Sequence, residues 1–532
     1  METTNKKSVQ TGYKCTHYAS IKIIEEYMYN LITKLSMIQK QFSRKSCFFT
    51  RLRQGGLLLG ATALMLASCA KDGYDDGERF VSDVSGATLV SPQADQITVT
   101  PSTDGKSQTI TWPVVKGAGG YLFSFFDAGN MEAPIVKDSL IDGCSVTVTR
   151  EEDMNYVARI KTMGKPSANN SEASEATELR ISTFTPTFKT IPSGTDLNDW
   201  FAANPVPDES IGSNLNYDLE AGGSYTVSKE LDFDGHWVTL RSNSKTSPAT
   251  ITYTTEASCI NFAAPFSVKY LKFDCSGMAA NNGVFGFSKA PTAARDAATE
   301  FVIFGGNVTI VNSMFENVNG YFFWDNRKDQ KVAAVQFLID NCVVEMTPPA
   351  SNSGAVIWTN KGGHINDLTV SNSTFYNCSA EGDVKYFYQA GMYRAKDINM
   401  GADQGGPGNS ITYKNSTFYR LGWNGGQWGN YNGMNGKNDS YWTMTDCIFY
   451  ACSQAGGVPR RFLHGKANQP TATFANNTYM QADGTFDNVG EYDTSGSQIE
   501  EDPQFANPSA GDFHVGGATQ LSRRTGDPRW LP

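Results

Sequence analysis

The sequence predicts an all-β protein whose larger part is a solenoid of stacked β-coils. A short sequence phrase recurs between residues 308 and 482. It consists of Asn or Asp, a small residue at the next position, and an aromatic residue or Val at the third position after the Asn or Asp. Its copies begin at Asn312, Asn341, Asn372, Asn415, Asp446 and Asn476. Successive copies lie 29, 31, 43, 31 and 30 residues apart, which is long for a β-hairpin, and no helical period fills the gaps. Each unit therefore reads as one solenoid coil that carries a loop.

Alternation around the repeated residue predicts two strands joined by a bend. Apolar side chains stand two and four positions before it, as Ile310 and Val308 do before Asn312. This period of 2 is typical of a strand with one buried face. The alternation changes phase after the Asn, and Asn tolerates a bend because its side chain bonds its own backbone. Stacked copies would place the amides in one column, each bonded to the next.

This pattern resembles the right-handed parallel β-helix of the pectin-lyase-like family, whose Asn ladder lies at the bend between two strands. The resemblance covers roughly residues 190–515, with Asp274-Cys275 as a looser early copy of the phrase. Leu197 to Gly223 is expected to cap the first coil. Residues 516–532 form a tail that could lay Trp530 on the exposed end of the solenoid.

Length, composition and charge limit the type of protein that this chain can be. A length of 532 residues predicts more than one domain, and 50 glycines with 18% charged residues are typical of a turn-rich extracellular β protein. The net charge of −10 and the lack of a basic stretch argue against a nucleic-acid partner. Cysteines such as Cys342 and Cys447 alternate with Ser in the repeated phrase, so we interpret them as small core residues.

The first 85 residues read as an export signal and a tether. Residues 1–68 are the signal region, with a natural start near Met37, and their apolar run is too short to span a membrane as a folded domain. Leu66-Ala67-Ser68-Cys69 resembles the lipobox of bacterial lipoproteins, which implies lipidation of Cys69. The acidic tether, residues 69–85, is similar to surface-export signals of Gram-negative glycan-foraging bacteria; the alternative is a plain solvated linker. We expect an outer-membrane lipoprotein at the cell surface.

Residues 86–184 carry strand-length runs separated by turns. Trp112, Tyr121 and Tyr156 give this region a resemblance to a fibronectin type III sandwich, in which such residues pack between two sheets. The resemblance implies a spacer between the membrane and the solenoid.

A third strand in each coil supplies candidate ligand-binding residues. Gly320 to Arg327 aligns with Gly354 to Lys361, and equivalent residues of stacked strands, about 4.8 Å apart, form a row. Long insertions on the same side add further aromatic residues. The candidates are Trp324, Arg327, Trp358, Lys361, Tyr388, Trp423 and Trp428. Aromatic faces suit sugar rings, and Arg or Lys suits a uronate or sulfate. The alternative is that Trp324 and Trp358 point inward and extend the core of Phe315.

The sequence contains fewer signals for catalytic residues than for ligand-binding residues. The resembled family contains lyases that abstract a proton with Lys or Arg, often with Ca²⁺, and hydrolases that use Asp pairs. Lys385, Arg394 and Arg420 are candidates by position, against the alternative of solvated surface charges. Asp325 and Asp383 could ligate Ca²⁺, but no carboxylate cluster accompanies them. We expect no cofactor unless the protein is a lyase, in which case Ca²⁺ is the candidate.

Three functions remain open from the sequence. The first is binding of a polysaccharide, neutral or acidic, through an aromatic and basic cleft. The second is a polysaccharide lyase or glycoside hydrolase, and the third is an adhesin or structural spacer. A Lys or Arg and an acidic group that converge in the aromatic cleft with shifted pKa values would favour the second over the first.

Overall fold

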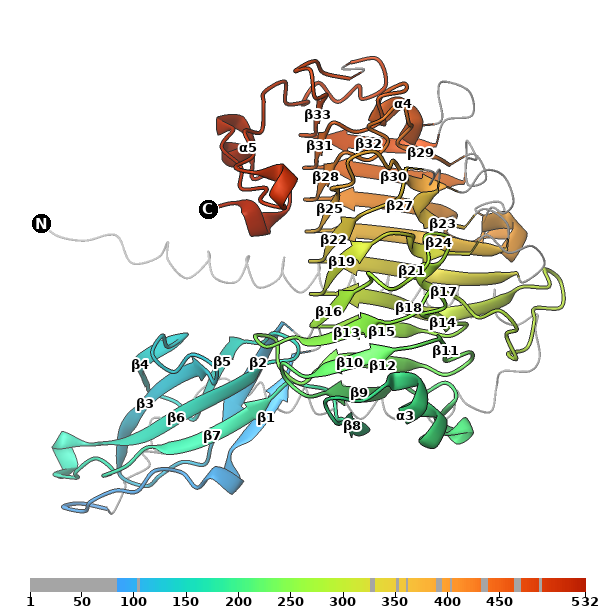
Figure 1. Cartoon of the computed structure of the whole chain (residues 1–532). Coiled ribbons are helices and arrows are strands. Elements are labelled where there is room, and N and C mark those ends of the chain that lie inside the picture. Colours follow the sequence, from blue (N-terminus) through green and yellow to red (C-terminus); the bar gives the residue numbers. More distant parts are fainter. Residues whose placement is uncertain are drawn as a thin grey trace, which may run out of the picture. The chain divides into compact units, whose positions relative to one another are not determined.

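A computed structural model describes residues 84–102, 106–325, 331–350, 354–359, 362–388, 395–401, 404–431, 439–463, 470–487 and 490–532. It confirms the predicted fold class, an all-β chain in which a fibronectin type III-like sandwich precedes a parallel β-helix (Figure 1). The chain divides into two compact units. Of the described residues, one unit contains Val84–Val90, Val114–Gly120 and Thr162–Ser174, and the other contains those within Ser91–Pro113, Tyr121–Lys161 and Glu175–Pro532.

The sandwich consists of two antiparallel sheets. One has the order β1 (Thr98–Pro101), β2 (Ser107–Thr111), β5 (Ser145–Thr149), and the other β4 (Val136–Ile141), β3 (Ala118–Asp127), β6 (Asn155–Gly164), β7 (Thr177–Ser182). Trp112, Tyr121 and Tyr156 are buried, as the sequence predicts, and the Trp112 and Tyr121 rings meet edge to face with centroids 5.4 Å apart.

The β-helix consists of three parallel sheets, each taking one strand from successive coils. The first sheet, which precedes the bend, contains β8 (Lys189–Ile191), β9 (Leu215–Leu219), β12 (Val238–Ser242), β15 (Phe266–Lys269), β18 (Val302–Val311), β21 (Val332–Asp340), β24 (Gly363–Ser371), β27 (Asn409–Lys414), β30 (Ser440–Thr445) and β32 (Thr471–Ala475). The second sheet contains β10 (Ser224–Val227), β13 (Ala249–Tyr253), β16 (Leu271–Asp274), β19 (Met314–Val318), β22 (Val343–Met346), β25 (Thr374–Asn377), β28 (Thr417–Tyr419), β31 (Ile448–Tyr450) and β33 (Thr478–Met480). The third sheet contains β11 (Glu230–Asp232), β14 (Cys259–Phe262), β17 (Gly283–Phe287), β20 (Tyr321–Trp324), β23 (Ala355–Trp358), β26 (Lys385–Tyr388) and β29 (Gly429–Asn430).

Short helices occupy the connections. They are α3 (Leu197–Ala203), α4 (Val458–Phe462), α5 (Ala518–Arg523) and the 3₁₀ turns η1 (Ala94–Gln96), η2 (Pro166–Ala168), η3 (Asp208–Ser210), η4 (Ala395–Ile398), η6 (Pro508–Ala510) and η7 (Pro528–Trp530). Within the described ranges, none of these helices has the length and apolarity that crossing a membrane requires.

Stacked aromatic side chains fill the coils. Equivalent residues lie ring on ring, with centroids 4.9 Å apart for Phe418 and Phe449 and 5.9 Å apart for Phe375 and Phe418. Cys342 and Cys447 are buried free thiols, which confirms their interpretation as small core residues. The predicted cap is also present, because Leu197 and Phe201 of α3 join the core of the first coils.

The repeated Asn or Asp residues mark the bend, as predicted. All six have a left-handed backbone, with φ between 47° and 56°. Their side chains bond in short runs, not in one continuous column. Asn341 donates to Asn312 at 2.6 Å and Asn476 to Asp446 at 2.9 Å, but Asn372 turns to Asp340 at 2.8 Å. The expected unbroken column is therefore wrong, since neighbouring carboxylates and the C-terminal tail compete for the amides.

Two sequence-based placements are corrected. Asp274 is the last residue of β16, not a corner; the pairing of Lys269 with Val311 and Lys272 with Met314 places Tyr270 opposite Asn312. Trp530 does not cover the end of the solenoid, because its indole nitrogen donates to Thr374 in the middle of the second sheet, at 2.8 Å.

Candidate functional site

Trp324, Trp358 and Tyr388 form one row, hereafter the aromatic row, on the third sheet. The strand register pairs Trp324 with Trp358 and Trp358 with Tyr388. All three side chains are half-buried, whereas Phe323, Ile357 and Phe387, which immediately precede them, are fully buried in the core. The row therefore faces outward, and the alternative that Trp324 and Trp358 extend the core is wrong.

Tyr321, which the sequence analysis did not select, is buried at 7% exposure and supports the aromatic row from beneath. Its ring lies parallel to Trp324, with centroids 6.2 Å apart, and meets Trp358 edge to face at 5.3 Å. Trp358 and Tyr388 are also 5.3 Å apart. Gly283 makes room for this packing, because a Cβ there would lie 2.8 Å from the Cβ of Trp324. Neighbouring rings thus hold one another in place before any ligand binds.

A hollow of about 270 Å³ opens beside the aromatic row. It is lined by Ala350, Gly354, Glu381, Asp383, Val384, Lys385, Asn424, Gly425 and Gly426. Lys385 links the hollow to the row, since its Nζ lies 5.7 Å from the ring centroid of Tyr388. Three of the lining residues are glycines, so backbone groups are accessible to a ligand there.

Lys385 and Asp383 have shifted pKa values within this hollow. Burial lowers the pKa of Lys385, although the nearby Asp383 carboxylate partly opposes the change. Burial raises the pKa of Asp383, against the effect of the backbone N–H groups that donate to it. Those donors include Trp423 at 3.1 Å and Asn424 at 3.2 Å, so Asp383 fastens the turn that carries both residues. Its carboxylate therefore positions the wall of the hollow.

Arg420 and Trp423 contact each other beside the hollow. The Arg420 guanidinium carbon lies 3.8 Å from the centroid of the Trp423 ring, and Nη2 donates to the Ser379 carbonyl at 3.1 Å. The Trp423 indole donates to the Gly382 carbonyl, also at 3.1 Å. The pair is thus anchored to the preceding coil, and Arg420 covers one face of the indole that was predicted to bind a sugar.

Trp428 is not a surface residue. Its side chain is fully buried and stacks on Tyr386 with centroids 4.7 Å apart, so its assignment to the ligand face is wrong. The surrounding glycines suggested an exposed loop, yet the chain re-enters the coil at β29. Asp325 is likewise fully buried. Among the residues that the structure describes, no group of three or more His, Cys, Asp or Glu side chains could hold a metal ion.

The remaining candidates lie outside the described residues. These are Arg327, Lys361, Arg394 and Cys69. The structure therefore brings together Trp324, Trp358, Tyr388 and Lys385, and adds Tyr321, Asp383 and Asn424 to them. Tyr321 could have been found from the sequence, because it opens the same run as Trp324; Asn424 has no comparable signal.

Comparisons with known proteins give families without a described activity. Three family models match successive parts of the chain, each described as a domain of unknown function: DUF4992 over residues 43–222, DUF4957 over 223–378 and DUF5123 over 411–530. No curated protein matches the chain. A solved structure, the fn3 domain of the human collagen alpha-1(XX) chain, is 22% identical, covering 20% of this chain and 94% of that chain, with a TM-score of 0.16.

Proposed function

We propose that the protein is an outer-membrane lipoprotein that binds a polysaccharide along the aromatic row. The observation that carries the proposal is the alignment of Trp324, Trp358 and Tyr388 on three successive coils. Parallel strands space such residues by about 4.8 Å, so a row offers a repeating set of ring surfaces to a repeating polymer. The CH faces of sugars pack on aromatic rings, and the preformed packing around Tyr321 keeps the entropic cost of binding low.

The hollow beside the row would supply polar contacts. Lys385, Glu381 and Asn424 offer donors and acceptors in its lining, and the Nζ of Lys385 lies over the Tyr388 ring. A few polar groups next to an apolar surface are typical of sites that fix the orientation of a ligand. Lipidation of Cys69 would hold this surface at the membrane.

A second candidate is a polysaccharide lyase, which the convergence of Lys385 and Asp383 in one hollow, with a lowered and a raised pKa, favours. A base works best when its pKa lies near the working pH, and burial moves the pKa of Lys385 in that direction. Binding comes first because three aligned rings carry it, whereas one lysine carries the catalytic role. In such a reaction the neutral amine of Lys385 would take the proton beside a uronate carboxylate. The electrons of the broken C–H bond would form a carbon–carbon double bond, and the adjacent carbon would release the glycosidic oxygen with its bonding pair. That oxygen would take up a proton from solvent, leaving an unsaturated sugar on the other fragment.

One experiment separates these functions. The purified chain is assayed against neutral and acidic glycans for retention in affinity gels and for new unsaturated ends. Trp358→Ala is expected to weaken retention about tenfold, which corresponds to about 1.4 kcal/mol. Tyr441→Ala is the matched control, because Tyr441 is an exposed aromatic residue, 43% accessible, on β30 of the first sheet.

Retention and new unsaturated ends together distinguish a binding protein from a lyase. Retention without new ends supports binding alone, whereas new ends that vanish in Lys385→Met but persist in Lys414→Met support a lyase. Lys414 serves as the control because it is exposed on β27, away from the hollow. Absence of both retention and product, or equal losses in Trp358→Ala and Tyr441→Ala, would contradict a ligand site on the aromatic row.

A further inference from the structure

Tyr270 occupies a corner of the coil that Asn or Asp occupies at every repeated phrase from Asn312 onward. It has the same left-handed backbone, with φ of 58°. This conformation strains a bulky residue, whereas Asn adopts it readily. A residue that breaks a local rule is expected to have a compensating contact elsewhere.

The compensating contact is with Asp153, in the turn between β5 and β6 of the sandwich. The Tyr270 hydroxyl donates to Asp153 Oδ2 at 3.1 Å, and Lys269 Nζ lies 3.0 Å from the same oxygen. The Asp153 residue is only 2% exposed and itself has a positive φ of 53°. A buried carboxylate needs such partners, because an unpaired buried charge is strongly destabilising.

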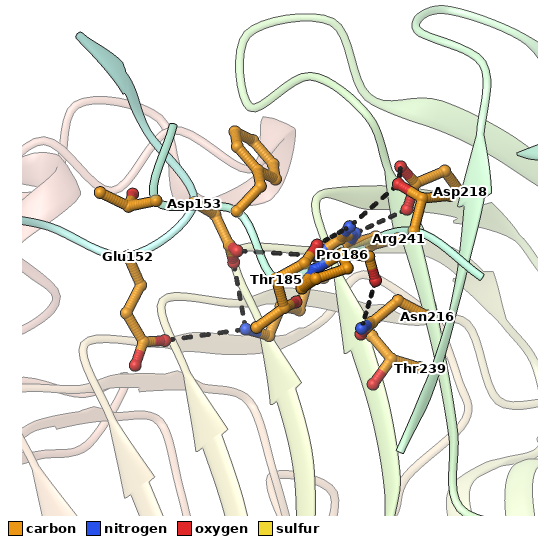
Figure 2. A network of polar contacts seen from close by, with 12 residues as sticks. Glu152, Asp153, Thr185, Pro186, Asn216, Asp218, Thr239 and Arg241 are labelled. Carbon is orange, nitrogen blue, oxygen red and sulfur yellow. Dashed lines mark hydrogen bonds and ion pairs between the residues drawn. The ribbon is translucent and has the colours of Figure 1, made fainter. Parts of the chain in front are cut away.

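Arg241 of β12, in the coil that precedes the coil of Lys269 and Tyr270, also contacts Asp153. Its Nη1 lies 3.7 Å from Asp153 Oδ1, and its Nε donates to Asp218 of β9 at 2.7 Å. The guanidinium also donates to the side chain and the carbonyl of Thr185, each at 2.7 Å, as Figure 2 shows. Arg241 is 1% exposed, and it lies between two carboxylates, Asp218 of its own coils and Asp153 of the sandwich turn. Three neighbouring strands, β9, β12 and β15, thus hold Arg241 and Lys269 next to Asp153.

A second contact reinforces the first. Lys245 Nζ donates to the Glu152 carbonyl at 2.6 Å and lies 5.5 Å from the centroid of the Tyr270 ring. The turn is thus held through its backbone at Glu152 and through its side chain at Asp153, with Tyr270 between the two contacts.

We propose that Arg241, Lys269 and Tyr270 form a docking socket for the Asp153 turn, which fastens the connection between β5 and β6 to the coils so that the two move as one body. The tyrosine is retained at this corner for its hydroxyl, and not for the coil, where an Asn would fit the backbone better. The partner that the socket accepts is a carboxylate on a tight turn of the same chain.

The test measures distances in the full chain. Bio-orthogonal spin labels are placed at Ser145 of β5 and at Glu256, both exposed. The unaltered chain is expected to give one narrow distance distribution, and Tyr270→Phe and Asp153→Asn are expected to broaden it at least twofold. Tyr225→Phe is the matched control, because its hydroxyl donates to Ile191 within the coils.

Tyr270→Asn separates docking from coil stability. This variant is expected to broaden the distance distribution while the thermal transition of the coils stays unchanged or rises. A broad distribution in the unaltered chain, or a narrow one in both Tyr270→Phe and Asp153→Asn, would overturn the proposal. If Tyr270→Asn also lowered the thermal transition, the tyrosine would serve the coil itself and the proposed reason for its presence would be wrong.

Discussion

At the scale of single residues, the coil is organised by backbone conformation at its corners. A left-handed φ costs a residue with a Cβ about 1–2 kcal/mol, and Asn and Asp reduce this cost by bonding locally. The six repeated residues all adopt this conformation, and most also bond a neighbouring coil through the side chain. The repeated Asn therefore serves the turn first and the stack second.

Variants at Asn372 separate the contribution of the left-handed turn from that of the hydrogen bond between coils. Asn372→Ala is expected to lower the free energy of unfolding by about 2 kcal/mol, because it loses the bond to Asp340 and the local side-chain bonding that makes a φ of 47° tolerable for a residue with a Cβ. Asn372→Gly loses the same bond without the strain, so its loss should be about 1 kcal/mol. Denaturant unfolding of both variants gives the comparison. Equal losses would contradict the assignment of the corner to backbone strain.

The corners also show what a sequence pattern can locate. Asn312 and its five later equivalents were predicted correctly because the phrase repeats with apolar residues at fixed offsets. Tyr270 was missed, and Asp274 was taken in its place, because the early corner is determined by a contact with Asp153 that lies 117 residues away. A distant partner of this kind leaves no periodic signal.

At the scale of elements, the aromatic row was predicted but its direction was not. Alternation fails in β20, where the adjacent Phe322 and Phe323 both belong to the core and Trp324 is half-buried outside it. The period of 2 that identifies other strands therefore gives no answer there. The hollow beside the row was not predictable either, since the turn at Trp423 is held by Asp383 from the preceding coil.

The turn that follows β33 should make stability depend on pH. Burial raises the pKa of Asp487 to about 6, above its ordinary value near 4 in an unfolded chain. A raised carboxyl pKa favours the protonated folded state, so this contribution is present below about pH 4 and is lost as the pH rises through about 6. The unfolding free energy should fall across this window, and Asp487→Asn should flatten the slope. Urea unfolding at pH 4, 5, 6 and 7 tests this, with Glu500→Gln, which removes an exposed carboxylate from the C-terminal part of the chain, as the control.

At the scale of the whole β-helix, a C-terminal strap, residues 518–530, bonds to several successive coils, beyond the contacts that Phe505 and Phe513 make with Tyr450, Tyr419 and Tyr376. It descends along the second sheet from Gln520, which donates to Thr478, to Arg529, which donates to Asn341 at 2.6 Å. On the way, the Asp527 amide donates to Thr417 at 3.0 Å and its carboxylate accepts from Thr374 at 2.8 Å. Figure 1 shows α5, the first part of this strap, beside the later strands of the β-helix.

The strap should make the later coils unfold together. Solenoid stability is a sum over neighbouring coils, so coils can separate thermally unless a longer contact crosses them. The strap buries the outward-facing Thr374, Thr417 and Thr478, which are fully covered although they lie on the outer face of the second sheet. A chain that ends at Gly517 would expose these three threonines and lose the bonds that cross from β33 to β22.

Calorimetry of the shortened chain tests this cooperativity. We expect the chain ending at Gly517 to show an additional transition at lower temperature, from the coils between β22 and β33, while the transition of the earlier coils remains. A chain ending at Trp530 is the matched control, because it lacks only Leu531 and Pro532, which follow the strap. Hydrogen exchange should assign the early transition to amides of β25, β28 and β31. An unchanged thermogram after removal of the strap would mean that neighbouring coils alone hold the later half together.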